Sequence, residues 1–293
     1  MTYNPNAVFI SPSSLGDFEK CAQLYYYRNI YRTSRGLRIQ LVNPALALGQ
    51  VVHDILAQFF LLPRGSRTRD QLLHILDISW SAISGEKGGF SSEEEESEYK
   101  KRGREMLERF MENSHFLETE PVKISSFPKV ELGDDLILTG KIDWIEKDEE
   151  GYHVIDFKTG KIEEREDSQQ LPIYALLVSK YFRTPTVRAS YCYLDKDEKV
   201  ISFALPKLEE TQEMLKKKGE IIKIMRQTNS FRCQSGGESC WACRDILAVV
   251  QGKGKLVGID PVNRKQEIYV LPKENFSSKP MPSAFTPPDD LPF

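Results

Sequence analysis

Two carboxylates and a lysine stand close together in the middle of the chain, within GKIDWIE (140–146) and VIDFKTGK (154–161). Asp143 and Asp156 each follow apolar, β-forming residues, which predicts that both lie on strands. On adjacent antiparallel strands such positions can lie opposite or diagonal to one another. Lys158 follows Asp156 by two residues. The two side chains therefore share one face, because side chains alternate along a strand.

This combination suits hard-metal chemistry. Mg²⁺ and Mn²⁺ take oxygen ligands, are held by one or two carboxylates, and leave positions for phosphate and water. A lysine beside them can orient or deprotonate the attacking water and balance charge in the transition state. The same spacing also fits two exposed acids and a lysine on the wet side of a sheet. Spacing alone does not decide between the two interpretations.

Other residues with chemical potential lie on predicted helices. Gln170 and Tyr174 are four residues apart and share a helix face, where they could equally be a polar helix start and a half-buried tyrosine. His53 lies in the apolar segment ALALGQVVHDILAQFF and is either a core histidine or a ligand. His153 precedes the strand of Asp156 and is expected to face solvent.

The five cysteines form an odd set that argues against a disulfide framework. Cys240 and Cys243 form a C-x-x-C pair, and Cys233 lies seven residues before it. Thiolates at such spacings can share one metal centre. Cys192, in the apolar strand segment ASYCYL, is expected to be a buried thiol.

Hydrophobic periodicity predicts the elements that must position these side chains. Helical spacing covers residues 11–31, 44–62, 92–116, 167–183 and 206–228, and alternation predicts strands over 122–132, 135–146, 152–157, 186–194 and 198–204. A β-hairpin is expected at about 255–271. Helices followed by a β-meander, a helix and further strands predict a mixed α/β core wrapped by helices.

Composition sets wide limits. The chain has 293 residues, 40% hydrophobic and 28% charged, which is ordinary for a globular protein. We expect a cytoplasmic protein without a signal peptide or membrane span. The net charge of -3 does not indicate a nucleic-acid-binding protein, so a DNA enzyme of this composition must concentrate Lys and Arg on one face. No Walker A sequence is present, so no helicase motor is expected.

GKIDWIE, then VIDFKTGK and QQLPIY (169–174), resemble the nuclease core of RecB-like and AddB-like PD-(D/E)XK proteins. That family reads G-[RK]-I-D, a strand ending in D-[FY]-K-T-G, and Q-L-x-x-Y on a helix. The resemblance is close over 140–174 and looser over about 8–245. It implies a restriction-endonuclease-like fold, with a central mixed β-sheet flanked by helices and with N-terminal helical elements.

The resemblance also implies roles for single residues. Asp143, Asp156 and the backbone carbonyl of Phe157 would bind Mg²⁺ or Mn²⁺, and Lys158 would be the catalytic lysine. Gln170 and Tyr174 would look into the active site and help to place the substrate backbone and Lys158. Gly49 and His53 reproduce a G-x-x-x-H spacing whose histidine is an additional metal ligand in the RecB-like branch.

Relatives in the AddB-like and CRISPR-adaptation exonuclease groups join both ends of the domain through a [4Fe–4S] cluster. The resemblance implies Cys21, Cys233, Cys240 and Cys243 as its ligands here, with structural Zn²⁺ and no metal as alternatives. The pattern departs from that of the family, because the additional cysteine precedes the C-x-x-C pair and Ala22 replaces the common proline after the first cysteine.

The last residues resemble the acidic tip of bacterial single-stranded-DNA-binding proteins. The tip is Asp289, Asp290, Leu291, Pro292 and Phe293, after a Pro- and Ser-rich stretch from residue 273. We expect a disordered tail whose tip could dock onto proteins that recognise such ends. A random acidic, Pro-rich end is the alternative.

These observations predict a nuclease domain over 8–250, with a catalytic core at about 120–205, a hairpin extension at 251–272 and a tail at 273–293. The predicted function is metal-dependent DNA cleavage, as an exonuclease or an end- or flap-processing enzyme in repair or recombination. A DNA-end-binding or scaffold protein with little cleavage is the alternative, and RNA cleavage stays open. The predicted partner is DNA, as single strands or duplex ends.

Overall fold

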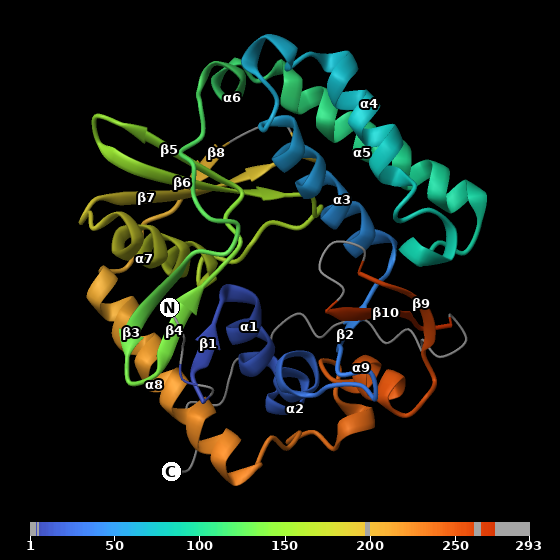
Figure 1. Cartoon of the computed structure of the whole chain (residues 1–293), viewed down its shortest axis with the longest axis vertical. Helices are drawn as coiled ribbons and strands as arrows, with labels where there is room; N and C mark the ends of the chain where they lie inside the picture. The colour runs from blue at the N-terminus through green and yellow to red at the C-terminus, as the bar shows by residue number, and fades with distance from the viewer. Residues whose placement is uncertain (1–3, 5, 197–199, 261–264, 273–293) are drawn as a thin grey trace.

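A computed structural model describes residues 4, 6–196, 200–260 and 265–272. The predicted tail, with its tip at 289–293, lies outside the described residues. The described part is a mixed α/β fold, as predicted, with helices packed around three small sheets (Figure 1). None of its helices is both long enough and apolar enough to cross a bilayer.

The sheet that carries the predicted active site has the strand order β5-β6-β7-β8. Its strands are Trp144–Asp148, Gly151–Lys158, Val187–Tyr193 and Val200–Ser202. β6 and β7 are parallel, whereas the other neighbours are antiparallel. Helix α7 (Gln170–Phe182) connects the two parallel strands and packs on them, because a parallel pair needs a crossover connection.

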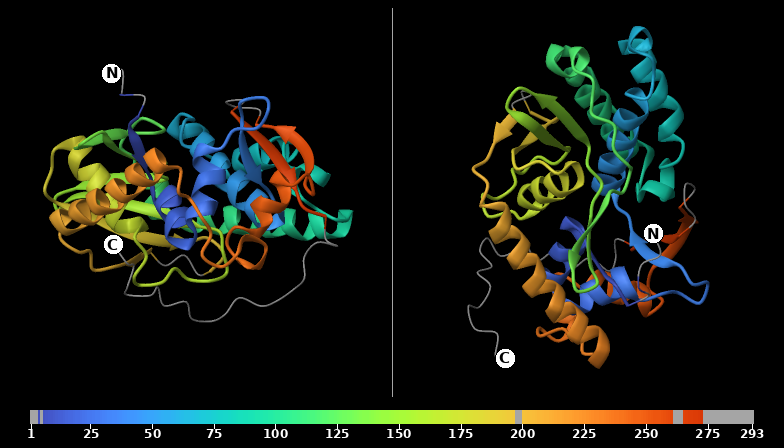
Figure 2. Two further views of the ribbon diagram at one scale, coloured as in Figure 1. Left: turned by 90° about the horizontal axis from the view of Figure 1, so that it is seen from below. Right: turned by 60° about the vertical axis from the view of Figure 1, so that its left-hand side comes forward.

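A second sheet joins the N-terminus to the middle of the chain. β1 (Val8–Ile10) pairs in parallel with β4 (Leu136–Thr139), and β3 (Lys129–Gly133) pairs with the other edge of β4. α8 (Leu208–Thr228) packs along β1 and α7. In the third sheet, β10 (Gln266–Val270) lies between β9 (Lys255–Ile259) and β2 (Arg38–Leu41), as both views of Figure 2 show.

Three helices pack together beside the catalytic sheet: α3 (Pro44–Phe59), α4 (Arg69–Trp80) and α5 (Glu93–Glu112). Asn43 caps α3 by accepting a hydrogen bond from Leu46 N at 3.0 Å, and Pro44 occupies the first turn, where a missing N–H costs nothing. The apolar side of α3 is buried in the largest hydrophobic cluster, which includes Trp144 and Phe157 of the catalytic sheet. That packing fixes His53, on the same helix, relative to the strands.

The structure corrects several predicted elements. The single strand expected over 135–146 is two strands in two different sheets, interrupted at 140–143. The helix expected over 11–31 breaks at Cys21, whose backbone is extended (φ -170, ψ 126). It continues as α2 (Ala22–Tyr25) and a π-helical turn, η1 (Tyr26–Ile30). The helix expected over 92–116 also ends early and is followed by the short α6 (Ser114–Glu118).

His153 is a further correction, because the side chain is buried and does not face solvent. Its Nδ1 lies 2.9 Å from Glu146 Oε1 and its Nε2 lies 2.7 Å from Ser190 Oγ. The second oxygen of Glu146 lies 2.8 Å from His115 Nε2 and accepts from the Trp144 indole at 3.1 Å. His153 therefore belongs to a polar network across the sheet.

Candidate active site

Asp143 and Asp156 meet at the end of the β5–β6 pair. The register Trp144↔Ile155 ends one residue short of Asp143 and Asp156, so the same register continued by one step sets these two opposite each other. Asp143 lies in the interruption between β4 and β5, and its Oδ2 accepts a hydrogen bond from Phe157 N at 3.0 Å. An N–H and a carbonyl of one residue point to the same side of a strand, so the Phe157 carbonyl also faces the side of Asp143.

Lys158 lies among three side chains of the site. Its Nζ is 3.1 Å from Asp156 Oδ2, donates to Gln170 Oε1 at 2.6 Å and lies 3.0 Å from Glu164 Oε1. The Gln170 amide in turn donates to Asp156 Oδ1 at 2.9 Å, closing a three-residue ring of contacts. The ammonium also sits over the Tyr191 ring at 4.7 Å.

His53 comes to this site from α3. Its Nδ1 lies 2.8 Å from Asp143 Oδ1, although the two residues are ninety positions apart in sequence. Gly49, one turn earlier, allows the approach: a Cβ there would lie 3.1 Å from Thr159 Oγ1 in the loop after β6. Asp54, the next residue after His53, pairs with Lys141 Nζ at 2.9 Å.

Tyr174 lies further along α7, one turn after Gln170, as the spacing predicts. Its hydroxyl donates to the carbonyl oxygen of Lys141 at 2.8 Å. Its ring packs against Gly140, where an added Cβ would come within 2.8 Å of the ring. The tyrosine therefore holds the loop that presents Asp143, since its hydroxyl bonds to the backbone of that loop.

The electrostatics of the site match a cation-binding centre. Burial, and next the charge of Asp143, raise the pKa of Asp156 to about 7. Burial alone would lower the pKa of His53, but Asp143 outweighs it and raises that pKa. For Lys158, Asp156 and Glu164 likewise outweigh burial and raise its pKa. Asp156 is buried and the Asp143 side chain is 11% exposed, and a bound cation would reduce the repulsion between the two carboxylates.

The donor set of carboxylates, an imidazole and a carbonyl fits Mg²⁺ or Mn²⁺. The positions of these side chains do not match those of a closed metal site. Among the described residues, the four cysteines are the one group of metal-binding side chains whose ligand atoms all lie within 4.8 Å. His53 contacts Asp143 while Asp156 contacts Lys158 and Gln170, so binding one ion with all three would require small side-chain movements.

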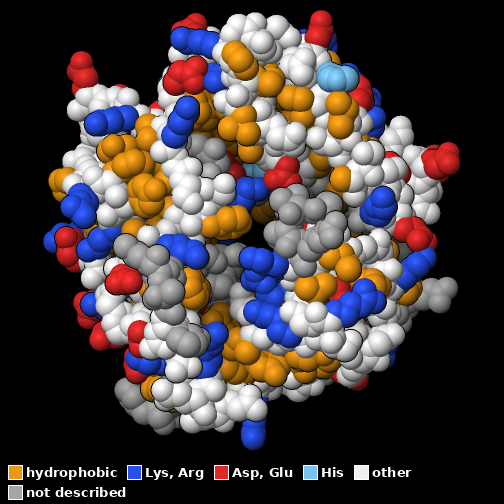
Figure 3. Space-filling view, viewed as in Figure 1, with side chains coloured by type: hydrophobic (Ala, Val, Ile, Leu, Met, Phe, Trp, Pro, Cys, Tyr) orange, Lys and Arg blue, Asp and Glu red, His pale blue; other side chains and the backbone are white. Residues whose placement is uncertain are grey.

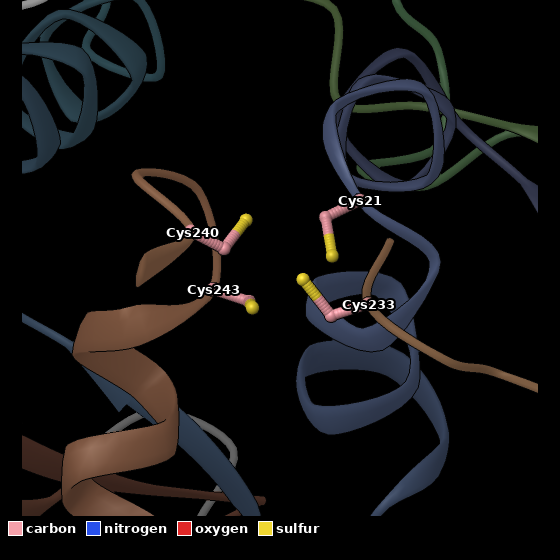
Figure 4. Close-up of side chains that lie close together, drawn as sticks. All are labelled: Cys21, Cys233, Cys240 and Cys243. Atoms are coloured by element: carbon pink, nitrogen blue, oxygen red, sulfur yellow. The ribbon is translucent and has the colours of Figure 1, made fainter. Parts of the chain in front are cut away.

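Cys21, Cys233, Cys240 and Cys243 point toward one another from both ends of the domain (Figure 4). Cys21 lies at the break after α1 (Pro12–Lys20), and Cys243 immediately precedes α9 (Arg244–Val250). All but Cys233 are buried. Four thiolates suit Zn²⁺ or an iron–sulfur cluster. The four sulfur atoms lie within 4.8 Å of one another, which is close to the sulfur–sulfur separation of about 3.8 Å around a single tetrahedral Zn²⁺. An iron–sulfur cluster is larger, so it would need the sulfurs to move apart.

Sequence reasoning missed Glu164, Tyr191, Lys141 and Asp54. Glu164 lies in an irregular loop after β6, where no periodicity predicts the direction of a side chain. The lysine of GKIDWIE could have been singled out from its place in the motif, but its partner Asp54 required the three-dimensional structure. Glu131 is exposed on β3, where it pairs with Ile137 of β4.

The face drawn in Figure 3 is hollowed at its centre, and Lys and Arg side chains gather around the hollow. A chain with a net charge of -3 thus still presents basic side chains together on one face. Such an arrangement attracts polyanions despite the overall charge.

Comparison with known proteins defines the class. The model of the PD-(D/E)XK nuclease superfamily matches residues 10–244, and the chain belongs to this superfamily. A crystal structure named "Putative exonuclease", from Eubacterium rectale, aligns over 81% of this chain and 87% of that one, with a TM-score of 0.51 and 14% identity. That likeness shows a shared fold.

The structure of a protein named SSO0001 aligns over 53% of this chain and 77% of its own, at 17% identity and a TM-score of 0.27. No protein with a curated description matches the chain in sequence.

Proposed function

We propose that this protein is a metal-dependent deoxyribonuclease of the RecB-like kind, cutting DNA as an exonuclease or at ends and flaps during repair or recombination. One observation carries the proposal: the contacts that join Asp156, Lys158 and Gln170, beside the Asp143–His53 pair. Membership of a nuclease superfamily supports the same chemistry.

Asp143, Asp156, His53 and the Phe157 carbonyl would hold the metal. Bound Mg²⁺ or Mn²⁺ supplies an activated water and neutralises charge on the phosphate oxygens. Lys158 donates to the water or to a phosphate oxygen near Asp156, and its three donors allow it to keep one carboxylate contact while doing so. Gln170 limits the freedom of both Lys158 and Asp156, because it contacts both through its amide.

Substitution of the two central groups tests the proposal. Asp156→Asn and Lys158→Ala should each lower the rate of DNA degradation by about 10²- to 10⁴-fold or more, the range for a positioned acid–base group. Asp148→Asn is the matched control, because Asp148 lies in the same hairpin, is exposed and pairs with Arg188. Its rate should equal that of the wild type.

The assay should use single-stranded DNA, duplex DNA and RNA of matched sequence. Degradation of DNA that depends on Asp156 and Lys158 supports the proposal. Cleavage by both variants at the wild-type rate would overturn the site assignment. Tight DNA binding without any cleavage would instead support the end-binding alternative.

The four cysteines belong to the same proposal in a structural role. We infer that they bind an iron–sulfur cluster, as in the resembling groups, and that this ties the N-terminal helices to the segment around α9. Broad visible absorbance and iron content of anaerobically purified protein would support the cluster. Colourless protein with one zinc per chain would show that the cysteines bind Zn²⁺ instead.

A further inference from the structure

Three arginines that play no part in the site above come together from distant parts of the chain. Arg32 follows the π-helical turn η1, Arg38 begins β2, and Arg226 lies in the last turn of α8. η1 contacts β2. Tyr25 stacks on Phe231, just after α8, and Tyr26 of η1 packs on the same ring at a tilt. We call these three residues the arginine cluster.

Within the described residues, each member lacks a carboxylate partner. In the described part of the chain no Asp or Glu oxygen lies within 4.0 Å of Arg32, Arg38 or Arg226. Asp17, on α1, is already paired with Arg28 at 2.7 Å. Burial and the charges of Arg38 and Arg226 lower the pKa of Arg32, so the cluster carries mutual repulsion. A bound anion would reduce this repulsion.

Two of the guanidinium groups are held in place while most of their donors stay available. Arg32 donates through Nη1 to the carbonyls of Tyr31, Ile30 and Asn29 at 2.7, 2.9 and 3.2 Å. Arg226 donates through Nη1 to the carbonyl of Ala7 at 3.0 Å. A guanidinium has five N–H donors in a planar fork that suits phosphate oxygens. Arg32 and Arg226 are also exposed.

Aromatic side chains accompany the cluster. Tyr26, Tyr27 and Tyr31 pack edge to face or tilted on one another, with ring centroids 5.3 to 6.4 Å apart, and all three are half-buried. Basic groups interleaved with aromatic rings are the pattern that grips single-stranded nucleic acid, where phosphates meet cations and bases stack on rings. A duplex offers no unstacked bases to such rings.

The position of the cluster suits a strand that leads to the active site. β2, which begins at Arg38, runs directly into α3, the helix that carries His53. Figure 3 shows Lys and Arg side chains beside the central hollow, over the region where Figure 1 draws α1, α2 and β2. A strand bound there would continue toward the hollow.

We propose that the arginine cluster binds the phosphates of single-stranded DNA outside the catalytic centre and thereby selects a single strand as the substrate. The inference rests on the proposed nuclease function for its purpose, but its binding step can be measured without catalysis.

The test measures binding of fluorescent oligothymidylate by anisotropy. It uses full-length Asp156→Asn protein with EDTA, so that no cutting occurs. Replacing all three arginines by Gln should weaken binding roughly tenfold or more at moderate salt. It should also reduce the magnitude of the slope of log affinity against log salt by about 2, since each phosphate contact on a single strand contributes about 0.7. Triple Lys replacement should keep most of the slope, because the charges stay.

A matched variant controls for net charge: Arg69, Arg104 and Arg165 changed to Gln, all in exposed ion pairs elsewhere. Its affinity and slope should equal those of the parent. Circular dichroism melting of each variant shows whether Arg32→Gln has unfolded η1, and the Lys variant keeps the inference testable if it has.

An unchanged slope in the Gln variant, or an equal loss in the control variant, would overturn the inference. A loss confined to duplex DNA would overturn it too. Arginine-dependent binding by a protein that cuts no substrate would leave the inference standing and remove the nuclease proposal, so the two failures are distinguishable.

Discussion

At the scale of single residues, the sequence is informative where chemistry is local. Asp156 and Lys158 lie on one strand, so the period of two sufficed to predict that their side chains meet, and they lie 3.1 Å apart. His53 is different, because nothing near it in sequence indicates Asp143 as its partner. Only the resemblance to a family suggested that role, and the 2.8 Å contact between the two side chains supports it.

A change at His53 separates metal binding from catalysis. His53→Ala should raise the Mg²⁺ or Mn²⁺ concentration for half-maximal cleavage by roughly ten- to a hundredfold, the range seen for groups that tune a metal site. Activity at saturating metal should fall less. Metal titration of the cleavage rate measures this, with His74→Ala on the exposed side of α4 as control. An unchanged titration curve would exclude His53 as a ligand.

At the scale of elements, the sequence predicted which residues form strands. It did not predict how the strands are divided among the sheets. Residues 135–146 alternate as one strand would, yet β4 ends at Thr139, and at Gly140 the Tyr174 ring occupies the space that a side chain would need. β1 and β2 were not predicted, since they are three and four residues long and pair with strands far away in the chain. α4 was also missed, although its buried residues Leu72, Leu76 and Trp80 keep helical spacing.

Gly140→Ala tests the close contact with Tyr174. The added methyl group would lie 2.8 Å from a ring carbon, so we expect a loss of about 1–3 kcal/mol in the free energy of unfolding. Denaturant unfolding measures it. Gly16→Ala is the control, since nothing lies within 4 Å of a Cβ at that helical position, and it should be neutral or slightly stabilising. Equal stability of both variants would contradict the packing argument.

The buried Glu146 network predicts a pH-dependent stability. Burial would raise the pKa of Glu146, but hydrogen bonds from His153, Trp144 and His115 outweigh it and hold the pKa at about 2, below the ordinary 4.5. A depressed carboxyl pKa stabilises the fold above about 4.5, and this contribution disappears as the pH falls toward 2. A shift of this size corresponds to about 3 kcal/mol at most.

Glu146→Gln should therefore destabilise the protein near neutral pH, and the difference from the wild type should shrink between pH 4.5 and 2. Urea unfolding across this range measures both. Glu149→Gln, in the exposed turn of the same hairpin, should leave the curve unchanged. A Glu146→Gln curve parallel to that of the wild type would refute the assignment.

At the scale of the whole molecule, the parts of the candidate site come from α3, the segment between β4 and β5, β6 and α7, while the cysteines bring together residues more than two hundred positions apart. The membership of Cys21 in this cluster was predictable only from the resemblance, because no local period relates Cys21 to Cys243. The end of the domain and the start of the tail were predicted from composition. Residues 273–293 lie outside the described part of the chain.

Cys243→Ser should lower metal content and reduce the melting temperature, since loss of one ligand releases the tie between α1 and α9. Cys192→Ala is the matched control, because Cys192 is buried in the catalytic sheet and not in the cluster. It should keep its metal even if it loses some stability. Equal metal content in wild type and Cys243→Ser would show that the four cysteines bind no ion.

The central claim is a metal-dependent DNA-cutting site built on Asp143, Asp156 and Lys158. Its most direct test is degradation of labelled DNA by protein freed of divalent metal with EDTA, followed by addition of Mg²⁺ or Mn²⁺. We predict no cleavage before the metal is added and full cleavage afterwards. Lys158→Ala should show no cleavage under either condition. Cleavage that persists in EDTA, or no cleavage of any DNA with either metal, would contradict the claim.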